Sequence, residues 1–258
     1  MRRLFLLPVA LCLLPSLTGC AKSPVGVTTL AINRFQTTLS LAGKLNPDYY
    51  YAIAYDDAGG DGVGPVAVDG NTPILNGVMG GTFRLLVLYH QNTFRVFYRP
   101  TSNSAASERE ISGTTNLFNT GLVPRATSNG LDVTINLDAQ LADGSFIFPR
   151  LSGSQTSPPA LQSTSFDINV AATNVVLRGG SSNNLIKPVD ALGAQTLSTP
   201  VEIQIPSTRT TSVSDATADE NLGVDSTYSD SNSPNFVPFP SIDVTNLQIG
   251  INRSQTGQ

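Results

Sequence analysis

The stretch TFRLLVLYHQNTFRVFYRP, from Thr82 to Pro100, decides the fold class of this chain. Apolar side chains recur at every second position in both of its halves: Phe83, Leu85, Val87 and Tyr89 in the first, and Phe94, Val96 and Tyr98 in the second. Successive side chains of a β-strand point to opposite faces, so this period predicts two strands. The residues His90-Gln91-Asn92 lie between them and are predicted to form the turn of a β-hairpin.

The same period of two recurs along the chain. It is found in FQTTLSLAG, YYYAIAY and LDVTINLD, and shorter candidates are SFDINV, TNVVLR, VEIQI and SIDVTNLQIGIN. In the last of these the apolar positions change phase near Asn246, which indicates a β-bulge. Short strands separated by Gly, Pro, Asn and Ser predict an all-β chain, folded as an antiparallel β-sandwich, jelly-roll-like or Ig-like, with long polar loops.

Three segments are predicted to be those loops: Thr101–Glu108, Ser152–Ser165 and the polar tract 207–235. The tract is rich in Ser, Thr, Asp and Asn and has little apolar surface to bury, so we expect it to be mobile. The alternative is an ordered loop that is pinned by hydrogen bonds of its own side chains.

The N-terminal residues MRRLFLLPVALCLLPSLTGC have the layout of a secretory signal. Arg2 and Arg3 precede an apolar run, Leu4 to Leu14, which is shorter than the roughly 20 residues that a membrane-spanning helix needs. The run exits through Leu17-Thr18-Gly19-Cys20, which resembles the lipobox of bacterial lipoproteins. The resemblance implies cleavage before Cys20 and an anchor of two or three acyl chains, with a diacylglycerol on the Cys20 sulfur.

This resemblance predicts how the chain is divided. Residues 1–19 are the signal peptide, 20–26 a lipidated tether, 27–252 a single β-sandwich domain that includes the tract 207–235, and 253–258 a tail. In the Gram-negative pattern of lipoproteins, Asp after the Cys favours the inner membrane, and this chain has Ala21. We therefore expect a lipid-anchored protein of the bacterial cell envelope, at the outer membrane where the host has one.

Cysteine and charge limit the partners. Cys12 would leave with the signal peptide, so that Cys20 remains alone and no intramolecular disulfide can form. The chain has 15 Lys and Arg against 19 Asp and Glu, a formal net charge of −4. Such a chain lacks the basic footprint of a nucleic-acid-binding protein and the basic patch that binds anionic lipid headgroups. We predict no nucleic-acid partner, and membrane attachment through the lipid on Cys20.

The candidate site is the acidic segment DDAGGDGVGP, which begins at Asp56. Its carboxylates, Asp56, Asp57 and Asp61, are ligands of the kind that calcium prefers. An EF-type loop that begins at Asp57 would have Gly59 at its third position and Val68 at its twelfth, so two side-chain ligands are missing. We therefore expect a Gly-rich turn between strands and no cofactor. A looser calcium site of the three carboxylates and backbone carbonyls is the alternative.

Together with the strand before it, this segment reads YYYAIAYDDAGGDGVGP. It resembles a broad class of extracytoplasmic β-sandwiches, those similar to family 9 carbohydrate-binding modules and DOMON domains. These often have a strand that ends in an Asp-rich loop closed by Gly-Pro, and later a strand like NGLDVTINLD, so the resemblance covers residues 49–138. It implies that the acidic segment is a rim loop of the sandwich. Those sugar binders stack their ligand on Trp, which this chain lacks, so Tyr would have to take that role.

Motifs of common enzymes do not occur in the sequence. His90 is the only His, it falls in a predicted turn, and G-x-S-x-G and H-E-x-x-H are missing. Glu108 and Glu110 would share one face of a short strand, where we expect a solvated edge. Arg95 and Arg99 flank Phe97 on what we predict to be a solvated sheet face, and the alternative is a small patch that binds an anionic ligand.

We therefore predict a binding or structural module without catalytic activity, whose partner is a glycan or another envelope protein. The alternative is a divergent hydrolase, or a calcium-dependent binding protein, that uses the segment Asp56–Asp61.

Overall fold

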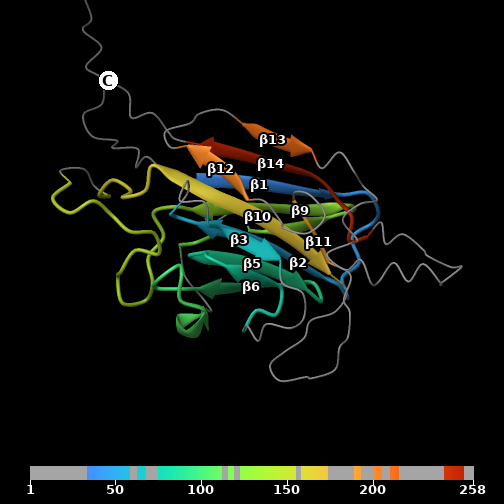
Figure 1. Cartoon of the computed structure of the whole chain (residues 1–258), viewed down its shortest axis with the longest axis horizontal. Helices are drawn as coiled ribbons and strands as arrows, with labels where there is room; N and C mark the ends of the chain where they lie inside the picture. The colour runs from blue at the N-terminus through green and yellow to red at the C-terminus, as the bar shows by residue number, and fades with distance from the viewer. Residues whose placement is uncertain are drawn as a thin grey trace, which may run out of the picture.

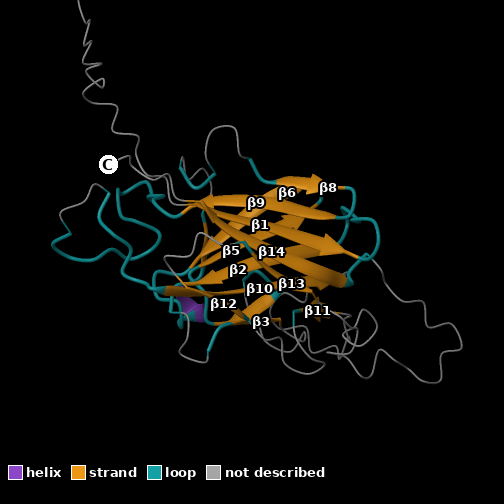
Figure 2. Cartoon of the chain, turned by 90° about the horizontal axis from the view of Figure 1, so that it is seen from above, coloured by secondary structure: helices purple, strands orange, loops and turns teal. Residues whose placement is uncertain are grey.

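The computed structural model describes residues 34–58, 63–67, 75–111, 116–118, 123–154, 158–173, 189–192, 200–204, 210–214 and 241–252. These residues form two antiparallel sheets packed face to face, so the predicted antiparallel β-sandwich is confirmed (Figure 1 and Figure 2). The predicted signal peptide, Cys20, Asp61 and the tail 253–258 lie outside the described residues.

One sheet has five strands in the order β13-β14-β1-β9-β8, and all of their pairings are antiparallel. Its strands are β1 (Arg34–Leu41), β8 (Arg125–Thr127), β9 (Gly130–Asn136), β13 (Thr211–Ser214) and β14 (Val244–Asn252). The first and last strands of the described residues, β1 and β14, therefore lie side by side, as Figure 1 shows.

The other sheet has seven strands, in the order β11-β10-β2-β5-β6-β7 with β12 also paired to β10. Its strands are β2 (Tyr50–Asp56), β5 (Leu85–His90), β6 (Thr93–Tyr98), β7 (Arg109–Glu110), β10 (Ser165–Thr173), β11 (Val189–Ala191) and β12 (Val201–Gln204). A short 3-10 helix, η1 (Ala105–Ser107), precedes β7. A separate pair of strands, β3 (Pro65–Ala67) and β4 (Met79–Gly81), forms a third, small sheet.

The hairpin predicted from Thr82–Pro100 is formed by β5 and β6. His90 pairs with Thr93, so the turn has two residues, one fewer than predicted. Those two, Gln91 and Asn92, have φ angles of 50° and 59°. A two-residue turn whose twist matches that of the strands needs positive φ at both positions, which Asn tolerates well and Gln less so.

The main core lies between the two sheets. It is built from the alternating residues that the sequence marks, among them Phe35, Leu39, Tyr51, Ile53, Tyr55, Val87, Leu131, Val133 and Ile135. The Phe35 ring is stacked 6.0 Å from the Tyr55 ring and meets the Phe166 ring edge-on at 4.9 Å. Aromatic pairs at these distances are stabilising beyond the area that they bury.

Part of the outer face of the seven-stranded sheet is also buried, because β3, β4 and the residues around them cover it. We call residues 63–67 and 75–83 the cover. Met79 and Phe83 of the cover pack against small side chains, Ala52, Ala54 and Ala171, on the sheet. Small residues on β2 and β10 let the cover approach closely, so β2 is buried on both of its faces.

Two details of the five-stranded sheet bear on the sequence. Ser40 pairs with Asn246 and Leu41 with Val244, so Thr245 is the extra residue of the β-bulge predicted near Asn246. In the tract 207–235, predicted to be a loop, residues 211–214 instead form β13 on the edge of the sheet. Short polar strands such as TSVS are common at edges, where little apolar surface is buried. Residues 215–240 lie outside the described residues.

Candidate functional site

The acidic segment begins where β2 ends, and its first two carboxylates diverge. Asp56 is buried on the side of the cover, where its Oδ2 accepts a hydrogen bond of 2.5 Å from the Thr82 hydroxyl. Asp57 lies on the other side, where it pairs with Arg84. Successive residues of an extended chain point to opposite faces, which accounts for the divergence. Asp56 and Asp57 therefore do not converge on one site, and Asp61 lies outside the described residues.

Asp56 has a second carboxylate beside it. It is paired across the strands with Asp167 of β10, and both side chains are buried. Glu202 of β12 pairs with Asp167 in turn, although Glu202 is exposed. Within the described part of the chain, no group of three or more His, Cys, Asp or Glu side chains is arranged to hold a metal ion. The turn without a cofactor, and its alternative of calcium binding by the segment Asp56–Asp61, both stay predictions.

Asp57 forms a bidentate ion pair with Arg84. The Arg84 Nε donates to both Asp57 carboxylate oxygens at 3.1 Å, and Nη2 lies 3.1 Å from Oδ2. The Arg84 Nη1 donates to the backbone carbonyls of Arg99, at 3.2 Å, and Pro100. Bidentate pairs of this kind fix orientation as well as adding energy.

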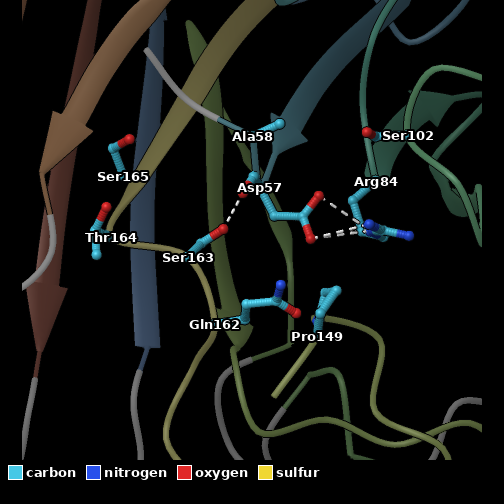
Figure 3. A pocket seen from close by; sticks show the side chains of 9 residues that line it. All are labelled: Asp57, Ala58, Arg84, Ser102, Pro149, Gln162, Ser163, Thr164 and Ser165. Atoms are coloured by element: carbon cyan, nitrogen blue, oxygen red, sulfur yellow. Dashed lines mark hydrogen bonds and ion pairs between the residues drawn. The ribbon is translucent and has the colours of Figure 1, made fainter. Parts of the chain in front are cut away.

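This ion pair lies in a pocket of about 470 Å³ at one end of the sandwich. We call it the rim pocket; it is lined by Asp57, Ala58, Arg84, Ser102, Pro149, Gln162, Ser163, Thr164 and Ser165. The pocket forms where β2 and β6 run out and where β5 and β10 begin, so four neighbouring strands contribute to it. Figure 3 shows the ion pair in the middle, with Gln162 and Pro149 on one side of it and Ala58 and Ser102 on the other.

The segment 162–165 is held against the end of β2. The Ser163 hydroxyl donates to the backbone carbonyl of Asp57, and the Gln162 N–H donates to the Pro149 carbonyl at 2.9 Å. Gln162 and Thr164 are exposed, and among the described residues their side chains make no hydrogen bond. The rim pocket therefore presents free neutral donors and acceptors beside a satisfied ion pair.

Sequence reasoning found Asp57 and missed the rest of the rim pocket. Arg84 stands within the predicted hairpin and carries no motif, and Gln162 and Thr164 lie in the segment Ser152–Ser165 that was predicted only to be a loop. Their only signal is that both segments flank strands next to β2 in the sheet, and strand order is not written in the sequence.

The sequence predicts a solvated edge for Glu108 and Glu110 and a solvated sheet face for Arg95 and Arg99. Each prediction is wrong for one residue, Glu108 and Arg99. Arg99 and Glu108 are buried and paired, with Nη2 2.7 Å and Nε 3.0 Å from Glu108 Oε2. The Asn76 amide and its backbone N–H donate to the other oxygen, Oε1, at 2.9 Å each. Burial lowers the pKa of Arg99, and the bonds to Glu108 oppose that shift. The cover brings Asn76 to this place, so the pair joins the cover to the sheet.

Tyrosine does not replace Trp as an exposed stacking platform in the described residues. Tyr51, Tyr55, Tyr89 and Tyr98 are buried. Tyr49 and Tyr50 are half-buried, and the Tyr50 ring is stacked on that of His90 with 3.8 Å between the centroids. His90 also contacts the Tyr49 carbonyl through Nδ1, at 3.2 Å. Neither Tyr50 nor His90 lines the rim pocket.

Comparison of the chain with protein-family models, curated proteins and solved structures finds no match. The resemblances to bacterial lipoproteins and to sugar-binding sandwiches therefore stay predictions. Among the residues that the structure describes, no helix has the length and apolar character needed to span a membrane.

Proposed function

We propose that this protein is a lipid-anchored, non-catalytic binding module of the bacterial envelope, and that it binds a glycan in the rim pocket. The observation that carries the proposal is a concave, polar pocket at the strand ends, with free neutral hydrogen-bonding groups on its wall. Its volume of about 470 Å³ falls within the range of small-ligand sites.

The chemistry of the lining supports a glycan over a protein partner. Sugar hydroxyls both donate and accept hydrogen bonds, as do the hydroxyl of Thr164 and the amide of Gln162. Protein interfaces are anchored by buried aromatic and Arg side chains, which the rim pocket offers only in Arg84, already paired with Asp57 and two backbone carbonyls. The described residues include four large exposed apolar side chains, and these lie in separate segments of the chain: Val63, Leu75, Val123 and Leu151.

The same lining supports binding without catalysis. Glycoside hydrolysis uses two carboxyl groups that face each other across the scissile bond. Asp57 is the single carboxylate among the described lining residues, and it is held by Arg84. His90 is stacked on Tyr50 at the hairpin tip, outside the pocket.

Binding is tested with the mature, detergent-solubilised protein on an array of bacterial and plant glycans. We expect binding to one class of glycan, and its loss on the double substitution Gln162→Ala and Thr164→Val. The matched control is Gln248→Ala with Thr127→Val, an exposed Gln and Thr on the five-stranded sheet. Binding that survives the pocket substitutions, or capture of an envelope protein and no glycan, would contradict the proposal.

Anchoring is tested separately at Cys20, which the lipobox resemblance marks. We expect Cys20→Ala to abolish metabolic labelling by an alkyne fatty acid and to move the protein from the detergent phase to the aqueous phase. Equal labelling of the variant and the parent protein would show that Cys20 carries no lipid.

A further inference from the structure

We infer that the rim pocket selects uncharged glycans, and that the Asp57–Arg84 ion pair sets this selectivity. The inference rests on the proposed function, because it concerns the ligand class of the same site. It follows from how the two charges of the pocket are used.

The rim pocket contains one negative and one positive side chain, and each neutralises the other. Asp57 and Arg84 are joined by three contacts of 3.1 Å, and the other lining residues are Ala, Pro, Ser, Thr and Gln. The described lining therefore has no net charge, although the whole chain carries a formal charge of −4.

Four of the five N–H groups of Arg84 are already engaged within the protein, so few donors remain for an anionic ligand. Its Nε and Nη2 point to Asp57, and its Nη1 donates to two backbone carbonyls. A carboxylate or phosphate on a sugar would have to displace Asp57 to form a bidentate pair with the guanidinium. Without that displacement it would lie beside the Asp57 carboxylate, and like charges repel.

The ion pair is also poorly hydrated, which strengthens it. The exposed fractions of the Arg84 and Asp57 side chains are 11% and 5%. Charges with so little access to water are screened weakly by salt, so the pair resists competition from charged ligands. An uncharged sugar meets no such barrier and can use Gln162, Thr164 and Ser102, whose side chains make no hydrogen bond among the described residues.

The pair can be unbalanced in either direction, which makes the inference testable. Asp57→Asn keeps the shape of the side chain and removes its charge, so that Arg84 leaves the pocket positive. Arg84→Gln leaves Asp57 alone and the pocket negative. If the pair sets selectivity, the first change should favour uronic acids and the second should favour sugars with free amines.

The experiment uses the mature protein and three sets of oligosaccharides on one array: N-acetylhexosamine or hexose oligomers, which are neutral, hexosamine oligomers with free amines, and uronic acid oligomers. We expect the parent protein to prefer the neutral set by about tenfold, the size of effect that 1.4 kcal/mol produces. Asp57→Asn should raise the ratio of uronic-acid to neutral binding by about tenfold or more.

A second pair of variants guards against misfolding of Asp57→Asn. Gln162 is exposed, so Gln162→Lys and Gln162→Glu add a charge to the wall and leave the Asp57–Arg84 pair in place. We expect Gln162→Lys to shift binding towards uronic acids and Gln162→Glu towards free amines.

The outcomes separate the two proposals. Pocket-dependent binding of uronic acids by the parent protein, at or above the level of neutral oligomers, would overturn the selectivity and leave the glycan site standing. Folded variants that leave the ratios unchanged would overturn the role of the pair. Binding of no oligosaccharide would overturn both.

Discussion

Two neighbouring Arg–Glu pairs, one on β6 and β7 and the other one residue beyond these strands, have different surroundings. Arg95 and Arg99 stand on either side of Phe97 in sequence, and they pair with Glu110 and Glu108. Both pairs have two hydrogen bonds, of 2.5 and 2.8 Å for Arg95 and of 2.7 and 3.0 Å for Arg99. The exposed fractions of the side chains are 28% and 40% in the first pair, and 0% and 1% in the second.

The cover makes the difference. The Arg99 guanidinium lies 3.6 Å from the centroid of the Phe83 ring and donates to the Gly81 carbonyl at 2.8 Å. Asn76 accepts hydrogen bonds from the backbone of Val78 and Met79 while it donates to Glu108. The cover thus supplies a further hydrogen-bond partner to each side chain of the buried pair. Both pairs consist of an Arg and a Glu, so residue type does not account for the difference in burial.

Breaking the buried pair should have the largest effect on stability. Glu108→Gln leaves Arg99 as a buried charge whose partner is gone, and changes of this kind cost about 3–5 kcal/mol. We expect a loss of that size in the free energy of unfolding from urea denaturation. Arg99→Met should cost a similar amount, because it leaves Glu108 as a buried charge without its partner. A loss below about 1 kcal/mol, as for exposed pairs, would show that the cover is open in solution.

Lifting the cover while both side chains of the pair are kept gives the next test. Gly81 ends β4 with a φ of +68°, and a Cβ at this position would lie 2.2 Å from the Gly64 carbonyl oxygen. Gly81→Ala should therefore destabilise the protein by roughly 1–3 kcal/mol, the cost of a strained backbone. Native-state hydrogen exchange should locate the loss at β3 and β4. Uniform loss over both sheets would mean that the cover and the sandwich unfold as one unit.

How much of this contrast the sequence predicts depends on how far apart the interacting residues lie along the chain. Strand period is local, so the hairpin Thr82–Pro100 and the bulge beside Asn246 could be predicted from neighbouring residues. Burial of Glu108 depends on Asn76, 32 positions earlier, which arrives through a cover whose strands have three residues each. So short a pattern carries no periodic signal, and an Arg–Glu pair looks the same in sequence whether it is covered or not.

The candidate site divides in the same way. Asp57 was predicted because carboxylates and glycines gather around it in sequence. Arg84 and Gln162 were not, because 27 and 105 positions separate them from Asp57 and only the order of β10, β2 and β5 brings them together. The alternative of a looser calcium site needs its carboxylates to converge. The extended backbone instead sends two of them, Asp56 and Asp57, to opposite sides.

Neutral buried groups on the main-core side extend the comparison to alkaline pH. The Tyr51 hydroxyl donates to the Ser241 carbonyl at 2.7 Å, and burial raises its pKa to about 12. Burial raises the pKa of Tyr55 further still. The folded state thus keeps protons that the unfolded chain loses above pH 10, so stability is fully present below pH 10 and falls as the pH rises towards 12.

Urea denaturation across this pH range, with the tyrosinate absorbance as a second readout, measures the effect. In Tyr51→Phe, the free energy of unfolding should fall less steeply as the pH rises. The cost of Glu108→Gln should be the same in this variant as in the parent protein. A free energy of unfolding that stays constant up to the pH at which arginine side chains lose their protons would contradict the burial of the Tyr51 and Tyr55 hydroxyls.

The smallest effect is expected at the exposed pair, and it decides whether burial or mere pairing matters. Glu110→Gln removes the partner of Arg95, whose pKa is raised by the hydrogen bonds that it donates to Glu110. Water and salt can replace that partner because both side chains are partly exposed, and exposed pairs contribute about 0.2–1 kcal/mol. We expect a loss within that range, which disappears when the salt concentration is raised. Glu108→Gln, measured in the same salts, should keep its full cost. If both losses respond to salt alike, the two pairs have similar access to water, and the cover does not close over Arg99 as described.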